Sequence, residues 1–159
     1  MSKILVTKPF QAPFAEVSAE IKKAWDAAWL TNNGPLLRQL EVQMRDALGA
    51  NDCAVVGNGT IALQIALRAV EASGEIITTP FSYVATTTSI IWEQATPVFV
   101  DIDPKTFNID PTKIEAAITP KTTTILATHV FGVPCDVEAI EAIAKRHNLK
   151  VVYDAAHCF

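Results

Sequence analysis

The residues with the clearest chemical potential stand in the segment LKVVYDAAH, where Asp154 and His157 follow an apolar run. A carboxylate at the carboxyl end of a buried strand is costly unless a partner stabilises it. The protonated ring nitrogen of a cofactor is one such partner, and the structural alternative is an aspartate that caps a neighbouring loop. His157 could hydrogen-bond a phenolic oxygen on the same ring, or it could be a structural histidine.

The turn Gly57-Asn58-Gly59-Thr60 is a second candidate site, because it follows a short apolar segment and opens a helical one. Free backbone N–H groups at the start of a helix favour a phosphate, and the Thr60 hydroxyl can add a bond. The alternative is a glycine turn with Asn58 or Thr60 as its cap. Tyr83, which follows the next apolar segment, could stack on a flat ring or pack as an ordinary tyrosine.

The same turn also matches the G-x-G-x-x-A pattern of nucleotide-dependent dehydrogenases through Gly57, Gly59 and Ala62. That pattern requires an acid about 20 residues later, at the end of the second strand, to hold a ribose. The sequence has Thr78-Thr79-Pro80 at this place, and the nearest acid, Glu75, precedes the strand. The dehydrogenase hypothesis is therefore disfavoured.

Two clusters could be read as metal ligands. His129, Asp154 and His157 all follow predicted strands, but two of them come from one loop and no fourth ligand is identified. Asp101 and Asp103 are more simply explained as residues that end a strand and turn the chain. We expect no metal site.

A regular alternation of strand and helix patterns must position these residues. Helical spacing predicts helices over 14–30 and 36–48, the second closed by Gly49, and further helices over 60–70, 83–92, 110–118 and 137–147. Strands joined by helices imply right-handed crossovers, a doubly wound parallel sheet and hence an α/β fold. Ligands bind such sheets beyond the carboxyl ends of the strands. The five predicted strands are CAVVG, EIITTP, PVFVDID, TTTILATHV and LKVVYD.

The composition limits the classes of function. Half of the 159 residues are hydrophobic, 19% are charged and the net charge is -4, which indicates a globular protein. The chain has no basic stripe, so nucleic acid is an unexpected partner. It also lacks a signal peptide and any apolar run that could span a membrane, and its three cysteines are scattered. We therefore expect reduced thiols, no membrane partner and a cytoplasmic location.

Several segments together resemble the DegT/DnrJ/EryC1/StrS family of pyridoxal-phosphate-dependent sugar aminotransferases. The resemblance covers nearly the whole chain, and its specificity comes from the order and spacing of the segments. It implies the aspartate-aminotransferase fold (fold type I), a three-layer sandwich around a mostly parallel sheet. The segments are TNNGPLLRQLE, LGANDCAVVGNGTIALQIAL, EIITTPFSYVATTTSI, PVFVDIDPKTFNID and ILATHVFGVPCDVEAIEAIAKRHNLKVVYDAAH.

The resemblance also implies roles for individual residues. In the family, pyridoxal 5'-phosphate accepts an amino group from an amino acid such as glutamate and passes it to a nucleotide-linked keto-sugar. The implied substrate residues are Thr31, Asn33 and Gly34, in a site that the family builds at a homodimer interface. Asp154 would pair with the ring nitrogen, and His157 would lie near the ring hydroxyl. The other implied cofactor residues are Asn58, Gly59 and Thr60 at the phosphate and Tyr83 on the ring face.

The same resemblance predicts that the sequence is an amino-terminal portion. Residues 1–50 would form an arm with helices, and residues 51–159 would begin the large cofactor-binding domain, with the small carboxy-terminal domain absent. The family's Schiff-base lysine lies downstream of the DAAH segment, so the chain alone is expected to be inactive. Some relatives carry histidine there and are dehydratases, and this alternative stays open. A non-catalytic module that binds cofactor or nucleotide-sugar, or serves only for association, is the other alternative.

Overall fold

The computed structural model describes residues 9–158, and the chain divides into two units between Val55 and Val56. In the first unit, α1 (Phe14–Asp26) ends before the predicted residue 30, since Ala28 adopts a left-handed φ of 50°. Helix α2 (Pro35–Leu48) starts with proline in its first turn and ends at Gly49, whose φ of 61° confirms the predicted cap. Neither helix contains a buried residue.

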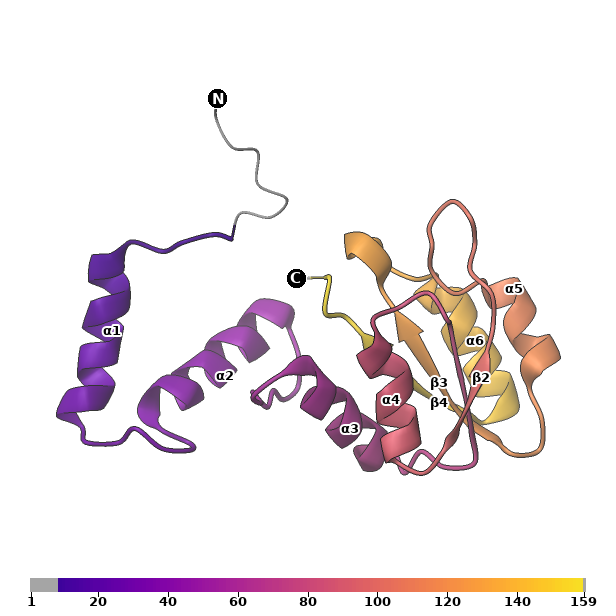
Figure 1. Ribbon diagram of the computed structural model, residues 1–159, viewed down its shortest axis with the longest axis horizontal. Coiled ribbons are helices and arrows are strands. Elements are labelled where there is room, and N and C mark those ends of the chain that lie inside the picture. Colours follow the sequence, from indigo (N-terminus) through magenta and orange to yellow (C-terminus); the bar gives the residue numbers. More distant parts are fainter. Residues whose placement is uncertain (1–8, 159) are drawn as a thin grey trace. The chain divides into compact units, whose positions relative to one another are not determined.

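The second unit is an α/β sandwich, as predicted from the strand and helix patterns (Figure 1). Its four strands are all parallel and lie in the order β2-β1-β3-β4. Two short 3-10 turns, Glu115–Ala117 and Val130–Gly132, complete the connections. The elements are α3 (Gly59–Ala69), β1 (Glu75–Thr78), α4 (Val84–Trp92), β2 (Thr96–Phe99), α5 (Pro111–Ile114), β3 (Thr122–Thr128), α6 (Val137–His147) and β4 (Lys150–Asp154).

The prediction of a first strand at CAVVG is wrong. Residues 53–57 have no strand partner among the described residues, and the Val55 N–H donates instead to Oε1 of Glu41 at 3.0 Å. An apolar segment becomes a strand only when a neighbouring strand takes up its backbone groups. The apolar composition of the segment is typical of a strand, but composition does not show whether a neighbouring strand is present to pair with it.

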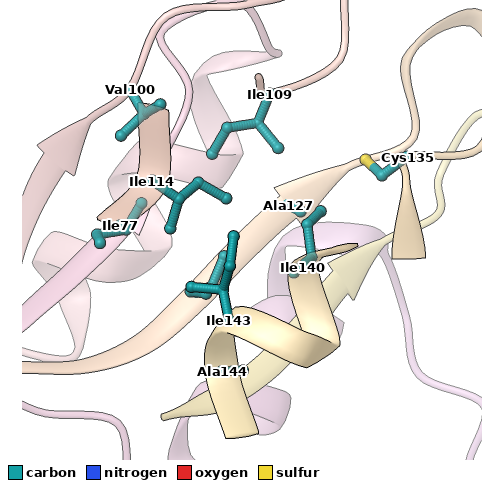
Figure 2. Close-up of a cluster of buried hydrophobic side chains, with 10 residues drawn as sticks. Ile77, Val100, Ile109, Ile114, Ala127, Cys135, Ile140, Ile143 and Ala144 are labelled. Atoms are coloured by element: carbon teal, nitrogen blue, oxygen red, sulfur yellow. The ribbon is translucent and has the colours of Figure 1, made fainter. Parts of the chain in front are cut away.

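Alternating side chains on the strands build one core on each face of the sheet. Ile77 and Ile125 point toward α5 and α6, where Ile140 and Ile143 join the cluster drawn in Figure 2. The next residues along the strands, Ile76 and Leu126, face the opposite side and pack with α3 and α4. Both faces are therefore covered, which explains why the strands read as continuous apolar runs.

Candidate functional site

Three neighbouring strands bring the candidate residues together at the end of the sheet where the carboxyl ends of the strands lie. Thr128 and Asp154 are the last residues of β3 and β4 and are direct partners in the parallel register. The loop that carries Ser82 and Tyr83 follows β1 on the other side of β3. Parallel sheets bind ligands beyond the carboxyl ends of their strands.

Asp154 is held by two donors from different elements. Its Oδ2 accepts from the hydroxyl of Thr86 on α4 at 2.9 Å, and its Oδ1 accepts from the Ala156 N–H at 3.2 Å. The carboxylate is half-buried, so these bonds offset part of its desolvation. The second bond is of the loop-capping kind, which is the structural alternative for Asp154. A role for Asp154 toward a cofactor nitrogen stays a prediction.

The turn before α3 has the groups that a phosphate requires. Oδ1 of Asn58 accepts from the Ile61 N–H at 3.0 Å, so Asn58 is the N-cap. Within residues 9–158, the N–H groups of Gly59 and Thr60 have no hydrogen-bond acceptor. A Cβ added at Gly57 or Gly59 would meet nothing within 4 Å, so packing does not explain these glycines. Open space above unpaired amides fits the approach of an anion.

Helix α4 connects this turn to the carboxylate. Thr86 and Ser89 lie three residues apart on α4, and both are fully buried. Thr86 donates to Asp154, and the Ser89 hydroxyl makes a long contact of 3.5 Å with the Thr60 carbonyl oxygen. One helical turn, about 5 Å, therefore separates the two anchor points. Helix α4 therefore contacts both Asp154 and the first turn of α3.

Tyr83 and His157 line the same cleft, which has a volume of about 240 Å³. The Tyr83 side chain is 75% exposed, and its backbone occupies the N-cap position of α4. His157 stacks on the Phe131 ring at a centroid distance of 6.0 Å, and its Nδ1 accepts from the Phe131 N–H at 3.2 Å. An exposed aromatic ring and a fixed imidazole at one cleft are suited to contact a flat heteroaromatic ligand.

His129 has a structural environment. Its ring stacks on Tyr153 with centroids 5.1 Å apart, and its Nδ1 accepts from the Cys135 N–H at 2.9 Å. Burial lowers the pKa of His129, although the nearby Asp154 carboxylate opposes this shift. Within the described part of the chain, no three His, Cys, Asp or Glu side chains are arranged to hold a metal ion.

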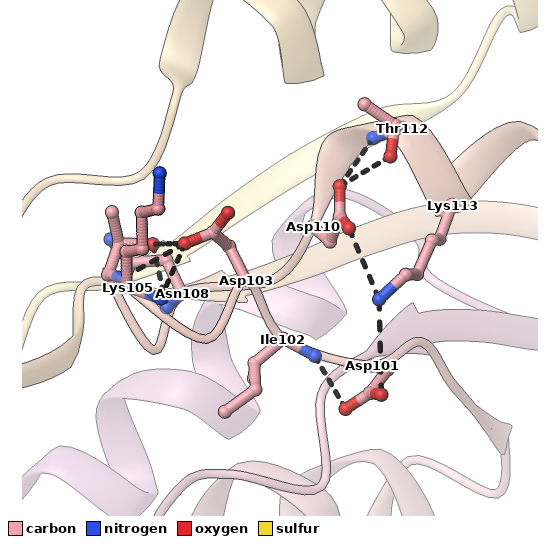
Figure 3. A network of polar contacts seen from close by, with 9 residues as sticks. Asp101, Ile102, Asp103, Lys105, Asn108, Asp110, Thr112 and Lys113 are labelled. Atoms are coloured by element: carbon pink, nitrogen blue, oxygen red, sulfur yellow. Dashed lines mark hydrogen bonds and ion pairs between the residues drawn. The ribbon is translucent and has the colours of Figure 1, made fainter.

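Asp101 and Asp103 organise the loop after β2, as Figure 3 shows. Oδ1 of Asp103 accepts from the N–H groups of Lys105 and Thr106 at 2.8 and 3.0 Å, and these bonds lower its pKa. The Lys113 ammonium lies 3.9 Å from Asp101 and 3.2 Å from Asp110. The aspartates are thus engaged in turns and ion pairs, in agreement with the simpler reading of the sequence.

Thr31, Asn33 and Gly34 belong to the first unit, in the loop between α1 and α2. Thr31 and Gly34 line a hollow of about 290 Å³ before α2. Arg38 donates through Nε to the carbonyl and to Oδ1 of Asn33, both at 3.1 Å, and its guanidinium covers the Trp29 ring at 5.2 Å. The loop is therefore shaped by its own contacts.

The sequence reasoning missed the hydroxyl groups that surround Asp154. Thr86 contacts Ser82 at 2.6 Å, and Ser82 contacts Thr128 at 3.2 Å. The available signal was the run TTTS inside the predicted helix over 83–92. Threonines lower helix propensity, so this run argues against a helix on propensity alone. In the structure, Thr86 and Ser89 of the run are buried and hydrogen-bonded.

Comparison with known proteins gives a family match and similar relatives for the chain. Residues 14–159 match the DegT/DnrJ/EryC1/StrS aminotransferase family. Over 156 residues the chain is 49% identical to dTDP-4-amino-4,6-dideoxy-D-glucose transaminase of Escherichia coli, a match that covers 98% of this chain and 42% of the relative. The chain therefore spans less than half the length of this curated relative.

Solved structures have the same fold. DesI in the presence of its TDP-sugar product superposes with a TM-score of 0.90 at 34% identity, over 95% of this chain and 38% of DesI. NtdA from Bacillus subtilis with bound cofactor PMP gives a TM-score of 0.85 at 32% identity, over 99% of this chain and 38% of NtdA. These likenesses confirm the α/β fold predicted from the sequence. Along residues 9–158, no helix has the length and apolar character needed to cross a membrane.

Proposed function

The chain belongs to the DegT/DnrJ/EryC1/StrS aminotransferase family, and we propose that it supplies the phosphate-binding and ring-binding residues of a pyridoxal-phosphate-dependent aminotransferase. The observation that carries this proposal is the pairing of a fixed carboxylate, Asp154, with the open amides of Gly59 and Thr60 across one turn of α4. When bound, the cofactor supplies an electron sink, which requires a protonated ring nitrogen.

The residues of the chain have distinct tasks in this proposal. Asp154 holds the proton on the ring nitrogen, because a neighbouring negative charge raises the pKa of that nitrogen. Gly59 and Thr60 bind the phosphate with Asn58 as the helix cap, Tyr83 covers the ring and His157 lies at the ring hydroxyl. The exposed ring of Tyr83 and the fixed orientation of His157 at the same cleft support the last two roles.

The proposed acceptor substrate is a keto-sugar linked to a nucleotide, and the proposed donor is an amino acid. The names of the relatives support this class, since one is a dTDP-sugar transaminase and another was solved with its TDP-sugar product. We assign Thr31, Asn33 and Gly34 to the sugar side of the site, in a homodimer. Their loop is held by Arg38 and lines a hollow.

We further propose that no lysine of this chain bonds covalently to the cofactor, so that the chain alone does not transaminate. Lys150 begins β4, and Lys121 directly precedes β3, at the end of the sheet opposite Asp154. Lys3 and Lys8 lie outside the described residues. Borohydride treatment of the chain with pyridoxal phosphate, followed by peptide mass spectrometry, tests this: selective modification of one lysine would contradict it.

The test of the cofactor site uses 4'-deoxypyridoxine 5'-phosphate, which keeps the ring and phosphate but has no aldehyde. Calorimetric titration should show binding to the chain, and Asp154→Ala should weaken it by about tenfold, the worth of one charged hydrogen bond. The phosphate turn should retain the remaining affinity. Asp101→Ala is the matched control, because Asp101 is an exposed carboxylate just beyond another strand. Equal losses in the two variants, or no binding to the chain, would refute the proposed site.

A further inference from the structure

A chain of three hydroxyl groups runs from the end of β3 to the Asp154 carboxylate. Thr128 Oγ1 lies 3.2 Å from Ser82 Oγ, Ser82 Oγ lies 2.6 Å from Thr86 Oγ1, and Thr86 Oγ1 lies 2.9 Å from Asp154 Oδ2. Thr86 is fully buried and Thr128 is 4% exposed. These hydrogen-bonded hydroxyl groups join the ends of β3 and β4, the loop after β1 and the first turn of α4.

The number of available protons fixes which hydroxyl group donates and which accepts in each of these hydrogen bonds. An ionised carboxylate only accepts, and each hydroxyl has one proton to donate. Because the Thr86 hydroxyl donates its proton to Asp154, Ser82 must be the donor to Thr86. Because Ser82 then has no second proton, Thr128 must be the donor to Ser82. Every hydroxyl therefore points its proton toward Asp154, and chains aligned in this way strengthen one another.

We propose that Thr86 is a positioning residue for the cofactor site, which holds the Asp154 carboxylate in the orientation that receives the ring nitrogen, with Ser82 and Thr128 fixing the Thr86 hydroxyl. This inference rests on the proposed function for the identity of the ligand. The hydroxyl chain itself belongs to the protein without cofactor. Experiments can therefore refute the hydroxyl hydrogen bonds and the proposed function separately.

The ligand test is a double-mutant cycle on binding of 4'-deoxypyridoxine 5'-phosphate. Thr86→Val keeps the shape of the side chain and removes the donor, and it should weaken binding by about threefold to tenfold. Thr86→Ser keeps the hydroxyl and should bind as the natural chain does. When Asp154 is already alanine, Thr86→Val should have no further effect, because its role acts through that carboxylate.

Thr88→Val is the matched control, since Thr88 lies on the same helix, is exposed and bonds only to backbone carbonyl groups of that helix. A loss in Thr86→Val that persists at full size in the Asp154→Ala background would show a packing role and would overturn the proposal. A loss that appears equally in Thr88→Val, or no loss in Thr86→Val, would also overturn it.

The cofactor-free chain provides an independent readout in hydroxyl proton exchange. Carbon-13 NMR in mixed H₂O and D₂O distinguishes a threonine hydroxyl that exchanges slowly from one that exchanges fast. The Thr86 hydroxyl should exchange at least about tenfold more slowly than that of Thr88, and Asp154→Ala or Ser82→Ala should accelerate it. If Thr86 exchanges as fast as Thr88, the hydroxyl chain is refuted even where the ligand binds. If the ligand does not bind and exchange is still slow, the proposed function and the positioning role toward a cofactor both fail, while the hydrogen bond from Thr86 to Asp154 stands.

Discussion

At the scale of single residues, His129 links the site to the pH dependence of stability. Burial lowers its pKa from the usual 6.5, so the unfolded chain takes up a proton at a higher pH than the folded chain does. The free energy of unfolding should therefore fall as the pH drops below about 6.5 and through the lower pKa of the folded state. His129→Asn does not titrate and can still accept from the Cys135 N–H.

We predict a smaller loss of stability for His129→Asn than for the natural chain between about pH 7 and about pH 5. Urea denaturation of both proteins at the two pH values measures the difference. The two proteins share every ionisable group except residue 129, so the contributions of the shared groups cancel in the comparison. Equal losses would show that His129 is not the group responsible.

The same scale shows which parts of the site the sequence could reveal. Asp154 and the turn before α3 could be found because a strand pattern ends in an acid and a glycine pair opens a helix. Thr86 and Thr128 could not be found in this way, because the sequence does not distinguish a buried threonine from one that is exposed to solvent. Only the contact across 68 residues of sequence gives Thr86 its role.

At the scale of elements, the start of α3 combines a stabilising cap with a proposed anion site. Asn58→Ala removes the side-chain oxygen that accepts from Ile61 and should lower the free energy of unfolding by about 1 kcal/mol. Asn58→Asp keeps an acceptor, so it should retain the stability. Its negative charge should nevertheless repel the phosphate of 4'-deoxypyridoxine 5'-phosphate and weaken its binding. Denaturation and calorimetry separate the two effects, and a loss of stability in Asn58→Asp would contradict this account.

The turn into β1 gives a second prediction at this scale. Gly74 has a φ of +62°, and a Cβ there would lie 2.5 Å from the carbonyl oxygen of Lys121. Gly49 has nearly the same φ, +61°, but an added Cβ would meet nothing within 4 Å. Gly49→Ala should therefore cost only the left-handed backbone penalty of about 1–2 kcal/mol. Gly74→Ala should cost more, because the backbone must also move, and similar losses of stability in urea would contradict the predicted clash.

At the scale of the whole molecule, local patterns gave the element types well and the pairings less well. The cap at Gly49 occurs where the sequence predicts it, because capping depends on neighbours within a few residues. The segment CAVVG has the composition of a strand but lacks a partner among residues 9–158. Strand formation depends on distant segments, and a local pattern cannot report them.

The exposed surfaces of the chain favour association in solution. Strands β2 and β4 are the sheet edges among the described residues, and α1 exposes Phe14, Ile21 and Trp25 along one face. Unpaired edges and contiguous apolar side chains both promote contacts between copies. We therefore predict a dimer or larger assembly by sedimentation velocity.

The α1 face can be tested directly, because the helix offers a matched pair of substitutions. Ile21→Glu places a charge within the apolar face, and Ala19→Glu places the same charge about 160° away around the helix, on an exposed residue. Ile21→Glu should shift the sedimentation distribution toward monomer, since burying an unpaired carboxylate in an interface is costly. Ala19→Glu should leave the distribution unchanged. A monomeric natural chain, or equal shifts in the two variants, would mean that this face does not drive association.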